Sequence, residues 1–113
     1  MIRRAFALAG LLLALVAAPA AFAGGAPSAV AGKDTFLKHC AACHGPDGMG
    51  KEAVAKMMKT TIPALPSPEV QKLTDAEMTK AIREGKGKMQ PVKDLSNADV
   101  ANLIAFTRSL AKK

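Results

Sequence analysis

The stretch His39-Cys40-Ala41-Ala42-Cys43-His44 contains both cysteines and both histidines of the 113-residue chain. It places two thiols two residues apart and an imidazole directly after the second thiol. Thiols and imidazoles are the side chains that most often bind metals or cofactors in proteins. The elements on either side of this stretch are therefore expected to fold around whatever it binds.

Three chemistries use a pair of cysteines with this spacing. A dithiol oxidoreductase places the pair at the start of a helix in a strand-helix-strand unit, but here the pair closes a predicted helix and no strand pattern is present. A structural zinc site needs two further ligands at finger-like spacing, and the only other histidine, His39, adjoins Cys40. Covalent haem attachment fits every residue, because two thiols add to two vinyl groups on one haem edge and His44 then lies beneath the iron. The stretch predicts one haem c attached through Cys40 and Cys43, with His44 as proximal ligand.

Residues 1–23 have the pattern of a cleavable secretory signal peptide. Arg3 and Arg4 form a basic head, an apolar stretch follows, and Pro19 precedes a small-residue end that closes at Ala23. Cleavage after Ala23 and export to the periplasm are the prediction. An uncleaved membrane anchor is the alternative, since the apolar stretch carries no charge, but Pro19 and the small-residue end favour cleavage.

The rest of the chain is a short lead-in at residues 24–31 and one domain at residues 32–113. Lys and Arg number sixteen against nine Asp and Glu, a formal charge of +7, and two of the sixteen lie in the leader. Phe36 and Phe106 are the only aromatic residues beyond the leader. A domain this small with so few large apolar groups needs a supplement to its core, such as a large apolar cofactor.

The periodicity of apolar residues predicts an all-α domain with about four short helices and long ordered loops. Three prolines exclude a regular helix from the loop at residues 62–68. Thr74 and Glu77 form a capping box, which predicts a helix that ends at Gly85. The helices are expected at residues 32–42, 51–58, 74–84 and 96–110.

This arrangement resembles a class I monohaem cytochrome c over nearly all of the chain beyond the leader. In that family a Gly and an aromatic residue on the N-terminal helix meet a Leu and an aromatic residue on the C-terminal helix. Gly32 and Phe36 match the first pair, and Leu103 and Phe106 match the second. The resemblance implies a cytochrome c-like fold wrapped around one covalent haem and a role in single-electron transfer.

The resemblance also implies the surroundings of the iron. It places a methionine ligand in the loop between the last two helices, where Met89 stands in an otherwise polar segment; a buried loop methionine is the alternative. Met78 fits the apolar stripe of its helix, Met57 and Met58 fit packing against the cofactor, and Met49 follows His44 too closely to reach the other face. A proline carbonyl near residues 63–65 is implied to accept the second ring N–H of His44.

Ligation by His44 and Met89 closes the iron to small molecules and predicts an electron carrier, not an enzyme. The sequence has no paired carboxylates, no nucleophile-base pair and no phosphate loop. Two alternatives remain: a haem protein with an open sixth position, acting as a gas sensor or weak peroxidase, and a haem subunit of a larger oxidoreductase complex.

Three lysines follow the attachment stretch and three more flank Met89, whose loop borders the exposed haem edge in the resembling family. They predict brief docking of acidic redox proteins onto a monomer, while neither nucleic acid nor stable membrane insertion is expected. The lysines are Lys51, Lys56, Lys59, Lys86, Lys88 and Lys93.

Overall fold

The computed structural model describes residues 26–111 and, ahead of them, Gly10 and Ala14. Apart from these two residues, the predicted signal peptide and its cleavage site lie outside the described part of the chain. The described residues form helices and no strand, which confirms the all-α prediction. No helix among them is both long and apolar enough to cross a membrane.

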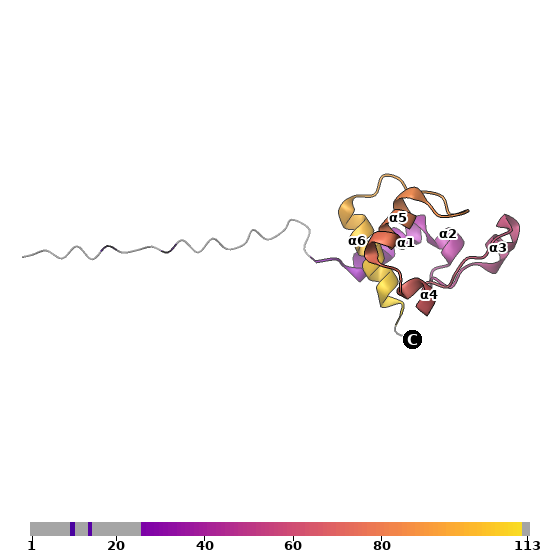
Figure 1. Cartoon of the computed structure of the whole chain (residues 1–113), viewed down its shortest axis with the longest axis horizontal. Helices are drawn as coiled ribbons and strands as arrows, with labels where there is room; N and C mark the ends of the chain where they lie inside the picture. Colours follow the sequence, from indigo (N-terminus) through magenta and orange to yellow (C-terminus); the bar gives the residue numbers. More distant parts are fainter. Residues whose placement is uncertain (1–9, 11–13, 15–25, 112–113) are drawn as a thin grey trace, which may run out of the picture.

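Six helices follow one another in the described part of the chain (Figure 1). The predicted helices at residues 74–84 and 96–110 are confirmed, and each begins with a capping box, Thr74 with Glu77 and Ser96 with Asp99. The bounds are α1 (Ala29–His39), α2 (Ala41–His44), α3 (Glu52–Met58), α4 (Pro68–Gln71), α5 (Asp75–Glu84) and α6 (Asn97–Ser109).

The observed helices differ from the expected ones at three places. α1 starts at Ala29 instead of residue 32, because the Ser28 side chain accepts a hydrogen bond from the Ala31 amide and caps the helix. The attachment stretch forms a separate short helix, α2, after a break at Cys40. α4 was not expected, but Pro68 stands at its first turn, where a missing N–H costs no hydrogen bond.

The close crossing of α1 and α6 is the centre of the fold. A Cβ atom on Gly32 would lie 1.9 Å from the carbonyl oxygen of Asn102, so only glycine allows this approach. Phe36, one turn further along α1, packs against Phe106 with ring centroids 4.9 Å apart. The Asn102 side chain accepts a hydrogen bond from the Ser28 amide at 2.8 Å, which fixes the start of α1 on α6. The helix contact implied by the resemblance is present.

The buried apolar side chains gather around this crossing. They come from α1, α4, α5, α6 and the loop before α6, and Met78 is among them, as its place on the helix stripe predicted. Cys40 and Ala41 are half-buried at the edge of this core, so the attachment stretch borders it. The buried residues are Phe36, Val70, Met78, Leu95, Val100, Leu103, Ile104 and Phe106.

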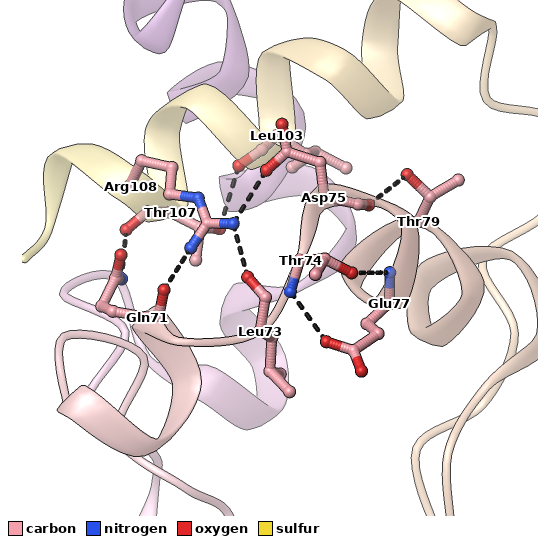
Figure 2. A network of polar contacts seen from close by, with 9 residues as sticks. All are labelled: Gln71, Leu73, Thr74, Asp75, Glu77, Thr79, Leu103, Thr107 and Arg108. Atoms are coloured by element: carbon pink, nitrogen blue, oxygen red, sulfur yellow. Dashed lines mark hydrogen bonds and ion pairs between the residues drawn. The ribbon is translucent and has the colours of Figure 1, made fainter.

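A polar network ties the segment between α4 and α5 to α6 (Figure 2). The Arg108 guanidinium donates hydrogen bonds to the carbonyls of Gln71 and Leu73 and pairs with the Asp75 carboxylate at 2.8 Å. The Gln71 side chain donates to the carbonyls of Leu65 and of Thr107, each at 2.8 Å. The carbonyls of Leu65, Gln71 and Leu73 have no recorded backbone donor, so these side-chain bonds satisfy them and hold the proline-containing loop against the end of α6.

We expect Gly32→Ala to destabilise the haem-loaded protein by about 3 kcal/mol, because the added methyl group forces α1 away from α6. Urea unfolding followed by far-ultraviolet circular dichroism measures the loss. Lys33→Ala, at an exposed neighbouring position, is the control and should change stability by no more than about 0.5 kcal/mol. Equal stability of the two variants would contradict the close crossing.

Candidate functional site

The two cysteines lie on one short helix. Cys40 precedes α2 and Cys43 belongs to it, and the amides of Cys43 and His44 both donate to the Cys40 carbonyl, at 3.3 and 3.0 Å. One turn of backbone separates the two cysteines, a spacing that allows both thiols to reach one edge of a cofactor. Both cysteines are free and half-buried, and therefore each can form a thioether bond.

The His44 ring lies next to the α1–α6 crossing. Its centroid is 6.3 Å from that of Phe36, and the two rings are tilted by 43°. Nδ1 of His44 is buried and has no hydrogen-bond partner among the described residues. Burial lowers the pKa of His44, which favours the neutral imidazole, the form that binds a metal. The expected hydrogen bond from His44 to the segment at residues 63–65 is not recorded in the structure.

Cys40 lies in apolar surroundings next to the core. Burial raises the pKa of the Cys40 thiol to about 11, so the group is protonated at neutral pH. An uncharged sulfur atom at this place is compatible with a thioether bond, which carries no charge either. A disulfide-exchange site, in contrast, lowers the pKa of its attacking thiol, and the environment of Cys40 therefore argues against that chemistry.

The backbone after the attachment stretch folds back onto it. The Gly50 amide donates to the His44 carbonyl at 2.7 Å, and the Lys51 amide donates to the Cys43 carbonyl at 2.9 Å. The Leu65 amide donates to the Gly48 carbonyl at 2.9 Å, which joins the proline-containing loop to the same turn. Gly48 has a φ of 77° and a Cβ there would meet Leu110 at 2.8 Å, so this turn requires glycine.

Met89 lies in a closed turn between α5 and α6. The amides of Lys86 and Met89 each donate to the carbonyl of the other, at 3.1 and 2.9 Å, and Met89 is half-buried. A Cβ on Gly85, whose φ is 80°, would lie 2.5 Å from the Met89 carbonyl oxygen. This glycine therefore lets the turn fold tightly against the end of α5, and the backbone of Met89 is held in place.

The other methionines are placed differently. Met78 is buried in the core, whereas Met49 and Met57 are 54% and 76% exposed. No residue of α3 is buried by the rest of the described protein, and the packing of Met57 against a cofactor stays a prediction. Met58, at the end of α3, is half-buried.

The residues around the attachment stretch fit a haem. Half-buried apolar side chains pack at the border of the core, which the attachment stretch also borders, and the buried Nδ1 of His44 has no partner within the described residues, so the imidazole is left available to a cofactor. Within the described residues, no group of three or more His, Cys, Asp or Glu side chains is placed to hold a metal ion. The half-buried apolar residues are Leu65, Leu73, Ile82, Val92 and Leu110.

Comparison with known proteins decides the family. A family model described as cytochrome c oxidase, cbb3-type, subunit III matches residues 27–106, which include the attachment stretch and Met89. The chain belongs to this family. As a c-type cytochrome it carries covalently bound haem, and its haem serves electron transfer. The resemblance to c-type cytochromes is thus confirmed.

A solved structure supports the same conclusion for the fold. The KustC0563 c-type cytochrome is similar to this chain with a TM-score of 0.60 and 27% identity, over 72% of this chain and 98% of that chain. The cytochrome c-like, all-α fold is therefore confirmed. No protein in the curated set matches the chain.

Two structural features of this cytochrome were not foreseen in the sequence. One is the Arg108 network, for which the only sequence signal is a basic residue in the last turn of a helix. The other is a hydrogen bond of 2.8 Å from Lys88 Nζ to the Met58 carbonyl, which joins segments thirty residues apart. No sequence motif marks the partner of Lys88 or the partners of Arg108.

We expect Cys43→Ser to hold haem through one thioether bond instead of two, so that one vinyl group stays unsaturated. The reduced pyridine haemochrome spectrum of the purified protein then moves to longer wavelength. Ala42→Ser adds a hydroxyl group between the cysteines without removing a thiol, and its spectrum should equal that of the unaltered protein. An unshifted spectrum for Cys43→Ser would show that Cys43 forms no bond to haem.

Proposed function

We propose that this cytochrome is an exported single-electron carrier with one haem c, held by Cys40 and Cys43 and ligated by His44 and Met89. The observation that carries the proposal is the placement of Met89. It is half-buried in a turn closed by two backbone hydrogen bonds, whereas Met78 belongs to the core and Met49 and Met57 face solvent. Met58 is also half-buried, at the end of α3, and Met89 is preferred to it because the family resemblance places the ligand in the loop between the last two helices.

The proposed ligands explain why this protein would transfer electrons and would not react with oxygen or peroxide. Bound haem supplies a one-electron couple at its iron. The neutral imidazole of His44 provides a nitrogen ligand, and burial beside Phe36 maintains that form. The thioether of Met89 favours the reduced metal and keeps small molecules from the second face, so this chain supports electron transfer over oxygen or peroxide chemistry.

Met89→Ala tests the assignment in the purified protein. The unaltered oxidised protein should show a low-spin spectrum with a weak far-red thioether band, and its reduced form should not respond to carbon monoxide. The variant should lose the band and bind carbon monoxide, because the sixth position is then open. Met49→Ala, at an exposed methionine, is the matched control and should leave both properties unchanged.

The same spectrum tests the first alternative, a haem protein with an open sixth position. A high-spin spectrum of the unaltered protein that shifts with carbon monoxide would indicate an open sixth position and a sensor or peroxidase. A far-red band that survives in Met89→Ala would assign the thioether to another methionine.

The family match favours a second candidate, a haem subunit of a larger oxidoreductase complex. The matching family is described as a subunit of a cytochrome c oxidase, and the same haem would serve there with a fixed partner. Native electrophoresis of periplasmic and membrane extracts, stained for haem, distinguishes the two. Migration at the size of the monomer supports the diffusible carrier, and comigration with oxidase subunits supports the complex.

The proposal includes acidic redox partners that dock briefly near the haem edge. Lys51 and Lys59 line a groove of about 600 Å³ beside α3, and Lys86 is exposed on the Met89 turn. Lys56 lines the same groove, but it pairs with Glu52 at 3.0 Å and so contributes less positive field. Unpaired surface lysines around a small apolar patch suit the weak, salt-sensitive interfaces of electron-transfer proteins.

We expect the double variant Lys51→Glu, Lys86→Glu to accept electrons about 10-fold more slowly from an acidic donor such as a flavodoxin at low ionic strength. Stopped-flow absorbance measures the rate over a series of salt concentrations, and the difference should shrink as salt rises. The double variant Lys33→Glu, Lys72→Glu reverses the same number of charges at two exposed lysines outside the groove and the Met89 turn, and is the control for net charge. Rates that equal those of the unaltered protein at every salt concentration would exclude docking at these lysines.

A further inference from the structure

α3 stands apart from the rest of the fold. Figure 1 shows it away from α1, α5 and α6, on the side toward which the turn at residues 86–89 projects. None of its residues is buried, and its ion pair, Lys56 with Glu52, lies within the helix. Among the described residues, one side-chain hydrogen bond joins α3 to another element, from Lys88 Nζ to the Met58 carbonyl at 2.8 Å. We call this bond the clasp.

The acceptor of the clasp is suited to a cation. Met58 is the last residue of α3, and Lys59 follows in the left-handed conformation, with a φ of 53°. The last carbonyls of a helix have no partner within the helix and carry the negative end of its dipole. A lysine ammonium supplies both the missing donor and the compensating charge.

The donor of the clasp is coupled to Met89 through the backbone. Lys88 and Gly87 are the two central residues of the turn that the reciprocal Lys86–Met89 hydrogen bonds close. The Val92 amide donates to the Ile82 carbonyl at 2.9 Å, which anchors the chain beyond the turn to α5. A displacement of Lys88 therefore moves Met89, while the ends of the loop stay fixed.

We propose that Lys88 is a positioning residue: through the clasp it holds the Met89 turn against the end of α3 and keeps the Met89 side chain at the haem. The inference rests on the proposed ligation by His44 and Met89. It separates Lys88 from the neighbouring lysines, since Lys86 and Lys93 make no recorded side-chain bond within the described part of the chain. Lys88 thus acts on the ligand set, and its effect does not require a partner protein.

Competition by an external ligand tests the clasp in the oxidised holoprotein. Imidazole is titrated into the protein, and loss of the far-red thioether band reports the displacement of Met89. Lys88→Leu removes the ammonium without adding a second thioether next to Met89, and it should lower the apparent Kd for imidazole about 5-fold, as expected for the loss of one exposed hydrogen bond. Lys88→Arg keeps a donor and should restore most of the difference.

Lys86→Leu is the matched control, since it removes the same charge from the same turn without breaking the clasp. Its Kd for imidazole should stay within about 2-fold of that of the unaltered protein. Equal Kd values for Lys88→Leu and Lys86→Leu would overturn the inference, and so would a decrease in Lys88→Leu that Lys88→Arg does not reverse. If Lys88→Leu is poorly produced, Lys88→Ala removes the same donor and is read in the same way.

The Met89→Ala spectrum separates this inference from the proposed function. If that variant keeps the far-red band, the ligand assignment is wrong and the clasp inference falls with it. If Met89→Ala loses the band and Lys88→Leu has the same imidazole affinity as Lys86→Leu, the ligation stands and the clasp inference alone is overturned.

Discussion

The contact between α1 and α6 is the constraint on which the site depends. Gly32 has no side chain, and the Asn102 carbonyl fills the space that a Cβ atom would occupy. The backbones of the two helices can therefore come into direct contact. The approach sets Phe36 against Phe106, and the same Phe36 ring faces His44. The orientation of the attachment stretch therefore follows from the helix crossing, because α2 continues from α1 after a single non-helical residue.

The far end of α6 fixes a second part of the site through polar contacts. Arg108 donates to the main-chain carbonyls of Gln71 and Leu73 (Figure 2), and the Gln71 side chain donates to the carbonyl of Leu65 in the proline-containing loop. That segment contains three prolines and little regular structure, so its carbonyls need partners from elsewhere. The donors on α6 and α4 provide them and hold Leu65 at the border of the core. Apolar packing at one end of α6 and hydrogen bonds at the other together frame the space around His44.

The small core explains why covalent haem belongs to the fold as well as to the function. The described residues bury eight apolar side chains, and two of them are aromatic. A domain of this size gains little stability from such a core alone, and a large apolar cofactor joined to the chain adds buried surface. α3 and the Met89 turn lie outside the core and have few apolar contacts. Segments of this kind depend on few hydrogen bonds, and the role proposed for Lys88 uses one of them.

The sequence by itself determined the features that depend on local chemistry. The attachment stretch, the capping boxes at Thr74 and Ser96 and the apolar stripe of α6 each involve residues close together in the chain, so their interactions can be recognised from spacing alone. The helix contact of Gly32 and Phe36 with α6 was available through resemblance to a known family. The haem-binding, all-α character of the chain followed from these features.

The tertiary structure alone decided the contacts between distant residues. Periodicity does not show that α3 lacks a buried face, that Lys88 reaches Met58, or that Arg108 serves the carbonyls of Gln71 and Leu73. An extra turn at the start of a helix or a short helix such as α4 depends on a single cap or proline, which periodic patterns do not detect. A long polar side chain bonds to whichever group the folded chain brings within reach. The distance between two residues far apart in the sequence cannot be inferred from the residues next to either of them.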